Sequence, residues 1–185
     1  DIVKYAKELV TQSDFAWNDI DGMGIGIPGL LDLKRGVVRI APNLHWENVP
    51  IKWFIEEQLE IPVKIENDAN IAVLGEAWTG AGKQYRHIVM TTIGTGIGAG
   101  IMIDGKILHG KHGMAAELGH LPISDEKILC GCGNYGCLET ISSATGIIRK
   151  AKEIVELEKP SLLTEQYKEA MENITAKSVI DAAKT

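Results

Sequence analysis

The cysteines of this chain all lie in one short segment, CGCGNYGC, as Cys130, Cys132 and Cys137. Three thiols this close together, and odd in number, do not form a disulfide framework. Tetrahedral zinc needs a fourth ligand, and His120 lies nine intervening residues upstream. These four side chains together predict a closed, structural Cys3His zinc site. A redox CxC pair and inert buried cysteines are the alternatives.

Two groups of acidic residues offer further chemistry. Asp68 lies in the segment END, which follows a short expected strand and opens a helix. Asp is a favoured N-cap residue, and the pattern alone favours that structural role. The second interpretation is a general base at the carboxyl end of a strand. Glu117 and His120, three positions apart in AAELGH, indicate a helix end with a solvent-facing glutamate, where small neighbours allow close packing.

The glycine-rich segment TTIGTGIGAG, residues 91–100, is a candidate phosphate-binding loop. Gly94, Gly96 and Ala99 match the dinucleotide pattern G-x-G-x-x-G/A. That motif requires a helix after the loop, whereas the following GIMIDGKIL predicts a strand and a hairpin. A strand–turn–strand unit can still bind phosphate through backbone N–H groups and the Thr95 hydroxyl. A glycine-rich turn without a ligand is the alternative.

Hydrophobic periodicity and turn residues predict the elements that position these groups. Strands are expected within residues 21–29, 36–44, 62–68, 86–94 and 97–110, the last with a hairpin turn at Asp104-Gly105. Helices are expected near residues 2–9, at 51–59, from residue 69, and in several segments after residue 140. In the first helix the expected apolar face is Ile2, Tyr5, Ala6 and Leu9. A composition shift at residues 79–85 predicts a boundary between two α/β lobes.

The composition is that of a globular protein, with 45% hydrophobic and 24% charged residues and a net charge of −6. The negative charge argues against nucleic-acid binding by this segment, because phosphate backbones attract clustered Lys and Arg. No apolar run is long enough to span a membrane, and the first residues lack the pattern of a signal peptide. We therefore expect a cytoplasmic protein, in which cysteines stay reduced.

In order along the chain, these segments resemble the ROK family (repressors, open reading frames and sugar kinases), and within it the ATP-dependent bacterial glucokinases. The resemblance runs from about Gly22 to Gly146 and rests on GIGIPG, APNLHW, IENDANIAVLGE, TIGTGIGAGI, HGMAAELGH, CGCGNYGCLET and SATGI. It implies an α/β, actin/hexokinase-like (ribonuclease H-like) fold of two lobes. Residues 1–85 would belong to the small N-terminal lobe, and residues 86–185 to the large C-terminal lobe with the zinc loop and helices.

The resemblance also implies an activity and roles for particular residues. The activity would be phosphorylation of glucose, or a related hexose, at the 6-hydroxyl with ATP and Mg²⁺. Asp68 would be the general base. The residues expected to bind the sugar are Asn67, Glu117, His120, Glu139, Gly29 and Asn43. A phosphate loop would consist of Gly94, Thr95 and Gly96. A structural Zn²⁺ bound by His120, Cys130, Cys132 and Cys137 would keep His120 and Glu139 in place.

Two segments typical of the family's kinases are missing: an Asp-x-Gly-Gly-Thr phosphate loop and a later glycine-rich adenosine-binding segment. The chain also begins with Asp1 rather than Met. We therefore expect the central part of a longer kinase, incomplete at both ends, with poor turnover alone. The alternatives are a transcriptional repressor that senses sugar with the same pocket, a kinase for fructose, mannose or an N-acetylhexosamine, and a zinc-stabilised scaffold. The resemblance also implies a homo-oligomer, a dimer or tetramer.

Overall fold

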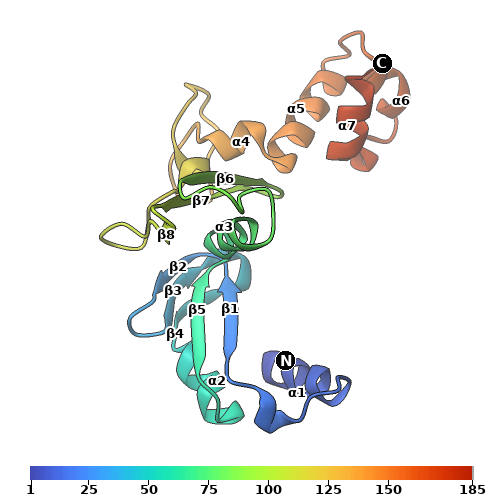
Figure 1. Ribbon diagram of the computed structural model, residues 1–185. Coiled ribbons are helices and arrows are strands. Elements are labelled where there is room, and N and C mark those ends of the chain that lie inside the picture. The colour runs from blue at the N-terminus through green and yellow to red at the C-terminus, as the bar shows by residue number, and fades with distance from the viewer. Residues whose placement is uncertain (185) are drawn as a thin grey trace. The chain divides into compact units, whose positions relative to one another are not determined.

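The computed structural model describes residues 1–184, which form a mixed α/β structure (Figure 1). The chain divides into two compact units. One consists of residues 1–89 and 100–115, and the other of residues 90–99 and the chain from residue 116 onward. The expected assignment of residues 1–85 and 86–185 to two lobes stays a prediction.

The first unit contains two sheets; three of their five strands fall within predicted segments, whereas the strands at Leu30–Asp32 and Trp46–Val49 were not predicted. Its helical elements are α1 (Ile2–Thr11), η1 (Trp17–Asp19), η2 (Pro42–Leu44), α2 (Ile51–Leu59) and α3 (Asp68–Trp78). The strands of these sheets are β1 (Met23–Ile27), β2 (Leu30–Asp32), β3 (Val37–Ala41), β4 (Trp46–Val49) and β5 (Val63–Asn67). β1 pairs with β5 in parallel, and β2, β3 and β4 form an antiparallel sheet. The β1–β5 register places Ile27 opposite Asn67, so residues after both strands emerge at the same end of this sheet.

The core of the first unit joins α2 to both sheets. Ile51, Ile55 and Leu59 are buried at i, i+4 and i+8, which gives α2 one apolar stripe. They form one cluster with buried strand residues such as Val38 and Val63, both at most 1% exposed. Burial of an aliphatic side chain of this kind contributes roughly 1.5–3 kcal/mol. The position of β5, and of the turn that follows it, is therefore set by this core.

The apolar face expected for the first helix is partly wrong. Tyr5 and Leu9 are 59% and 67% exposed, whereas Val3 packs against the core together with Ile2 and Ala6. Residues 3, 6 and 10 have helical spacing as good as that of residues 2, 5 and 9. Periodicity alone could not choose between the two stripes.

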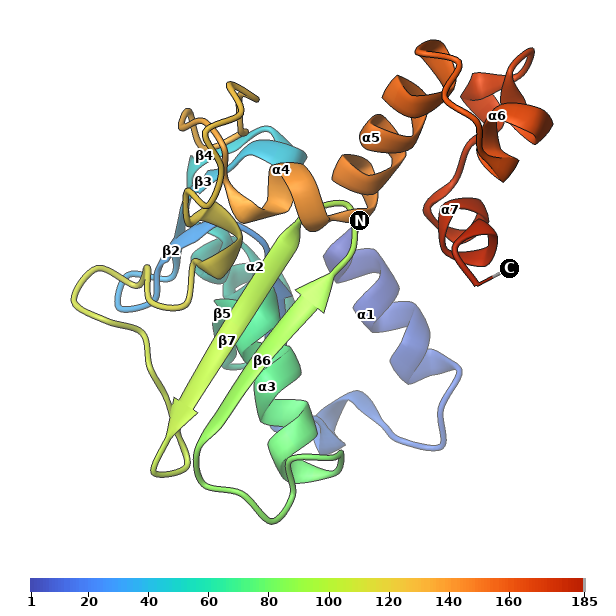
Figure 2. The ribbon, with the colours of Figure 1, turned by 90° about the horizontal axis from the view of Figure 1, so that it is seen from above.

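The glycine-rich turn connects two neighbouring strands, as the sequence predicts. The third sheet has the order β6-β7-β8, with β6 (Ile88–Ile93), β7 (Ile97–Ile103) and β8 (Lys106–Ile107). Figure 2 shows β6 and β7 side by side and running in opposite directions. β7 pairs with β8 antiparallel through the predicted Asp104-Gly105 turn, where φ is +51° and +76°. Positive φ at both central residues is typical of two-residue hairpins.

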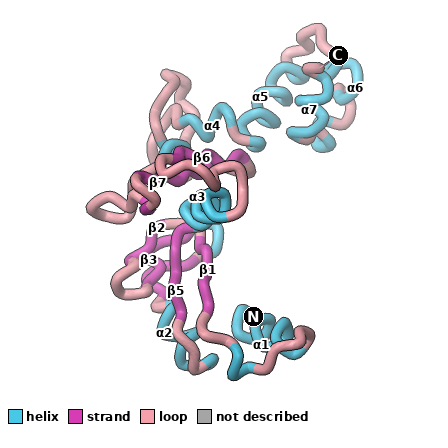
Figure 3. Tube along the Cα trace, viewed as in Figure 1, coloured by secondary structure: helices cyan, strands magenta, loops and turns pink. Residues whose placement is uncertain are grey.

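The second unit is mostly helical after a long irregular segment. Its helical elements are η3 (Leu118–His120), α4 (Leu138–Ser142), α5 (Ala144–Glu156), α6 (Leu162–Tyr167), η4 (Met171–Asn173) and α7 (Ala176–Ala182). Figure 3 shows that the segment between the third sheet and α4 consists largely of loops. α5 packs against α6 and α7 through a small core that includes Ala151, Val155 and Leu163. Every helix in the described part of the chain falls short of the length and apolar character that crossing a bilayer requires.

Candidate functional site

The turn from β5 into α3 carries Asn67 and Asp68. The Oδ1 atom of Asn67 accepts hydrogen bonds from the backbone N–H groups of Ala69 and Asn70, at 3.0 and 3.2 Å. Asn67 is therefore the N-cap of α3, and the cap role that the pattern favours for Asp68 is wrong. Asp68 is the exposed first residue of the helix, and its Oδ1 lies 2.9 Å from the Ala69 nitrogen. Among residues 1–184 its Oδ2 atom has no hydrogen-bond partner.

The carboxylate of Glu66 stabilises the same turn, a role that was not predicted from the sequence. Its Oε1 atom accepts from the Asn67 backbone N–H at 2.8 Å and from the Asn70 side chain at 3.0 Å. Its Oε2 atom lies 2.7 Å from Nε2 of His109, 43 positions later. Such a long separation leaves no periodic or local pattern from which the contact could be predicted.

Gly29 and Asn43, also expected near the sugar, lie in the same unit. Gly29 has φ of +104°, and a Cβ atom there would lie 2.9 Å from Cα of Ala41, so only glycine fits. It follows β1 at the same end of the sheet as Asn67. Asn43 is exposed in η2, and within residues 1–184 no hydrogen bond joins it to the β5–α3 turn. Its proposed contact with sugar stays a prediction.

The four residues predicted to bind zinc lie together in the second unit. One donor atom from each of His120, Cys130, Cys132 and Cys137 lies within 4.8 Å of all the others. Nδ1 of His120 is 3.4 Å from Sγ of Cys130, and the Sγ atoms of Cys132 and Cys137 are 3.7 Å apart. Tetrahedral zinc with Zn–S bonds of about 2.3 Å separates two sulfurs by about 3.8 Å. The donor set therefore fits a closed zinc site.

The three thiols of the cluster differ in burial and in pKa. Burial raises the pKa of Cys130 and of Cys137 above the ordinary thiol value. The N–H of Asn134 lowers the pKa of Cys132, which is exposed. Without a cation, Cys130 and Cys137 are therefore neutral thiols, and binding of a divalent metal ion would release their protons. The grouping of the four donor atoms, rather than the pKa values, favours a metal site over inert core cysteines.

Two carboxylates, those of Glu117 and Glu139, lie beside His120 of the metal-binding cluster. Nδ1 of His120, which faces Cys130, lies 3.5 Å from Oε1 of Glu139, while its Nε2 lies 3.9 Å from Oε2 of Glu117. Sγ of Cys130 donates to Oε1 of Glu139 at 2.9 Å. Nδ1 of His120 thus faces the cluster, and its Nε2 faces Glu117. The structure therefore brings the predicted ligands and two predicted sugar-binding carboxylates together.

The glycine turn lies against the same glutamate. Oε2 of Glu139 is 3.4 Å from the backbone nitrogen of Ile97, and a Cβ atom at Gly96 would lie 2.6 Å from that oxygen. Two hydrogen bonds from the start of α5 also hold the glycine turn. There the Ala144 N–H donates to the carbonyl of Gly94 and the Thr145 hydroxyl donates to that of Thr95, at 2.9 and 2.8 Å. Because β7 follows the turn directly, the helix that a dinucleotide motif requires is absent from this position.

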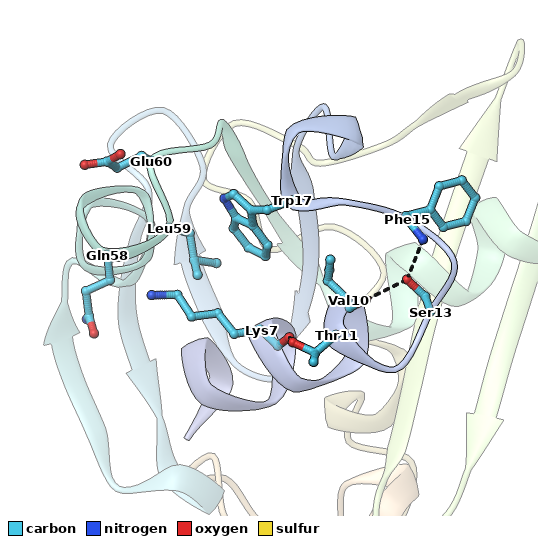
Figure 4. Close-up of a pocket in the computed structure, with 9 residues that line it drawn as sticks. All are labelled: Lys7, Val10, Thr11, Ser13, Phe15, Trp17, Gln58, Leu59 and Glu60. Atoms are coloured by element: carbon cyan, nitrogen blue, oxygen red, sulfur yellow. Dashed lines mark hydrogen bonds between the residues drawn. The ribbon is translucent and has the colours of Figure 1, made fainter.

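A separate pocket of about 660 Å³ lies between α1 and the end of α2 (Figure 4). Its walls include the side chains of Lys7, Phe15 and Trp17. None of the residues predicted to bind sugar, phosphate or metal lines it. Its volume would suit a small molecule, but its lining offers no carboxylate–histidine or cysteine grouping. The residues predicted to carry chemistry lie elsewhere, in the β5–α3 turn and in the cysteine-rich loop.

Comparisons with known proteins connect these features to one family. The model described as the ROK family matches residues 1–185, the whole chain. A glucokinase of Halalkalibacterium halodurans is 45% identical over 167 residues, which cover 90% of this chain and 50% of the relative. A xylose repressor of Caldicellulosiruptor bescii is 38% identical over 165 residues, covering 88% of this chain and 40% of the relative. The chain thus spans half or less of the length of these two relatives.

One solved structure supports the same fold. A ROK family glucokinase from Streptomyces griseus, in complex with glucose and AMPPNP, aligns with a TM-score of 0.79 and 35% identity. The alignment covers 99% of this chain and 59% of that one. The expected α/β, actin/hexokinase-like fold class is therefore confirmed for the part of the fold that this chain spans.

Proposed function

This chain belongs to the ROK family, and on that premise we propose that it carries the sugar-phosphorylating residues of a hexose kinase, with glucose as the preferred substrate. The observation that supports the proposal most is the division of roles between Asn67 and Asp68. Asn67 caps α3, so the exposed carboxylate of Asp68 is available for chemistry at the end of β5. Carboxyl ends of strands are where α/β proteins commonly place such groups.

Asp68 acts in this proposal as the general base. Its carboxylate takes the proton from the 6-hydroxyl of the hexose as that oxygen attacks the γ-phosphorus of ATP. The new O–P bond forms while the bond to the β-phosphate oxygen breaks, and ADP leaves. ATP supplies the phosphoryl group, and Mg²⁺ bound to it neutralises its charge. The chain's contribution is to position the hydroxyl and to accept its proton.

The residues around the cysteine-rich loop bind hexose hydroxyls in this proposal. Glu117, His120 and Glu139 offer the acceptors and donors that a polyhydroxylated ligand requires. His120, Cys130, Cys132 and Cys137 would hold a structural zinc ion, which would keep the loop and the His120 ring in place without taking part in the reaction. Asn67, Gly29 and Asn43 contribute further sugar contacts. Gly94, Thr95 and Gly96 bind phosphate through the backbone and the Thr95 hydroxyl.

A phosphorylation assay of the protein that contains this chain, across a panel of hexoses with ATP and with polyphosphate, tests the proposal. We expect ATP-dependent formation of glucose 6-phosphate, reduced by a factor of about 10² to 10⁴ in Asp68→Asn. Asp21→Asn, at another exposed aspartate of the same unit, is the matched control and should keep full activity. Near-normal activity of Asp68→Asn would show that the base is another residue.

The second candidate function is a sugar-responsive repressor. The 38% identity with a xylose repressor favours this function. A repressor could use the same polar residues to sense a sugar. In this case the same residues bind sugar but no phosphoryl transfer follows. Calorimetric sugar binding without product from any hexose and donor in the panel would favour the sensor over the kinase.

A further inference from the structure

We propose that Glu66 and His109 form a positioning pair that holds the β5–α3 turn, and with it Asn67 and Asp68, in the conformation that phosphoryl transfer requires. The inference rests on the proposed kinase function and adds two residues to it. Both residues lie in the first unit. Glu66 belongs to the segment END, but no role was predicted for either residue from the sequence. The pair acts through its neighbours, since within residues 1–184 no hydrogen bond joins Glu66 or His109 to the Asp68 carboxylate.

The first step of the argument is that one carboxylate connects three segments. Glu66 accepts from the backbone of the turn itself, from the Asn70 side chain in the first turn of α3, and from His109 after β8. A carboxylate oxygen can only accept, so Nε2 of His109 carries the hydrogen in this contact. Asn70 is only 6% exposed, and its backbone N–H is already bound by the Asn67 cap. Hydrogen bonds to two side chains, those of Asn67 and Glu66, therefore stabilise the turn.

The second step is that this contact is more than a surface ion pair. Exposed pairs contribute little, because solvent screens them and both side chains lose freedom. The Glu66 side chain is only 19% exposed and makes three hydrogen bonds, and the His109 side chain is 38% exposed. Loss of His109 would leave one partly buried carboxylate oxygen without its donor, a costly state for a charged group.

The third step is that His109 is itself held in place. The carbonyl of His109 accepts from the Ala115 N–H at 3.1 Å, which closes residues 109–115 into a loop. Gly110 and Gly113 have φ of +69° and +73°, conformations that favour glycine. His109 therefore presents Nε2 to Glu66 from a constrained loop. Because the loop holds His109 in place, its Nε2 atom can fix the position of the Glu66 carboxylate. A histidine on a flexible loop would instead move with the carboxylate.

The expected consequence is a loss of catalytic rate rather than of sugar affinity. A displacement of about 1 Å at the base can cost about a hundredfold in rate, because proton transfer needs a narrow geometry. The sugar would still meet its other polar partners. We expect His109→Ala to lower kcat for hexose phosphorylation by about tenfold or more, with the hexose KM changed by less than about threefold.

The test compares five variants of the protein that contains this chain. His109→Ala removes the donor, and His109→Gln supplies an amide N–H that can reach Glu66 and should restore most of kcat. His112→Ala is the matched control, since His112 is an exposed histidine of the same loop that makes no hydrogen bond within residues 1–184. In Glu66→Ala combined with His109→Ala, the loss should be no greater than in Glu66→Ala alone, because the pair acts as one unit. Unchanged kcat in His109→Ala, or an equal loss in His112→Ala, would overturn the proposal.

A readout that does not depend on activity separates this inference from the proposed function. We expect faster amide hydrogen exchange at Asn67 and Asn70 in His109→Ala than in the unsubstituted protein, with the rest of the β1–β5 sheet unchanged. If the unsubstituted protein phosphorylates no hexose, the kinase proposal fails, and exchange alone decides on the pair. Unchanged exchange at both amides would overturn the pair whatever the activity.

Discussion

The Oε1 atom of Glu139 lies 2.9 Å from the Sγ atom of Cys130, so a proposed sugar-binding carboxylate touches a proposed metal ligand directly. The other oxygen of the same carboxylate lies 3.4 Å from the nitrogen of Ile97, at the end of the glycine turn. One side chain therefore contacts both the metal-binding cluster and the candidate phosphate loop. A change in the metal-binding cluster or in the glycine turn should therefore alter the position of the Glu139 carboxylate.

Loss of a thiol should abolish metal binding. We expect about one zinc ion per chain in the unsubstituted protein and less than about half an equivalent in Cys130→Ser, because a closed site needs all four ligands. Elemental analysis of freshly purified protein measures this. Tyr135→Phe, at an exposed residue of the same loop, should keep the full metal content. Full zinc in Cys130→Ser would contradict a Cys3His site.

Two alanine substitutions in the glycine turn should have different effects on sugar binding. A Cβ atom at Gly96 would lie 2.6 Å from Oε2 of Glu139, whereas one at Gly94 would meet nothing within 4 Å. Glu139 is a flexible side chain and can move aside, so Gly96→Ala should leave the fold intact. It should weaken hexose binding by about tenfold, the loss of roughly one hydrogen bond to a charged group.

Calorimetry with the hexose in the absence of nucleotide measures this difference, because it leaves out the phosphate contacts proposed for the turn. Gly94→Ala is the matched control and should bind hexose as the unsubstituted protein does. Equal affinity in the two variants would show that Glu139 does not bind the sugar from its position beside Gly96.

Substitutions at Asn67 and Asp68 should separate stability from activity. Asn67→Ala removes the N-cap of α3 and should lower the free energy of unfolding by about 1 kcal/mol. Asp68→Asn keeps that cap and should change stability by less than about 0.5 kcal/mol, while it removes phosphorylation. Denaturant unfolding, followed by circular dichroism, gives the stabilities. A larger stability loss in Asp68→Asn than in Asn67→Ala would reverse the two roles.

The stability of the first unit should depend on pH through Asp32. The N–H of Arg35 and the guanidinium of Arg39 donate to its carboxylate at 3.1 and 3.0 Å, and they lower the pKa of Asp32 below its ordinary value. A carboxyl group with a lower pKa in the folded than in the unfolded chain stabilises the fold above the unfolded value, about 3.9. That contribution disappears as pH falls through the folded pKa.

Thermal unfolding of Asp32→Asn at pH 7 and at about pH 3 checks this expectation. The variant should have a lower Tm than the unsubstituted protein at pH 7, and the difference should shrink at the acidic pH, where the wild-type carboxylate begins to take up its proton. A difference in Tm that is the same at both pH values would mean that ionisation of Asp32 does not stabilise the fold.

The metal cluster and the glycine hairpin were accessible from the sequence because their signals are local. Three of the four predicted ligands lie in residues 130–137, and few chemistries use such a grouping. The strand after Gly96 was predictable because GIMI, followed by Asp104-Gly105, specifies a hairpin. The proximity of His120 to this loop is the one part of the site that depends on the tertiary fold. In the structure the donor atoms of all four predicted ligands lie within 4.8 Å of one another.

The remaining features depend on tertiary contacts that a sequence does not display. Asn and Asp are equally good N-cap residues, so the sequence Asn67-Asp68 could not show which side chain accepts hydrogen bonds from the first backbone N–H groups of α3. The contact between Glu66 and His109 joins residues 43 positions apart. The contact of Glu139 with Ile97 depends in the same way on how α4 meets the hairpin.

The capping of α3 by Asn67 bears on how such a chain can diverge during evolution. Because the helix does not depend on Asp68 for its cap, a substitution at position 68 would end the proposed proton transfer while leaving the fold and the proposed sugar contacts of other residues in place. A lineage could therefore exchange turnover for sensing through a single codon. Asn67, by contrast, would remain under selection in both descendants.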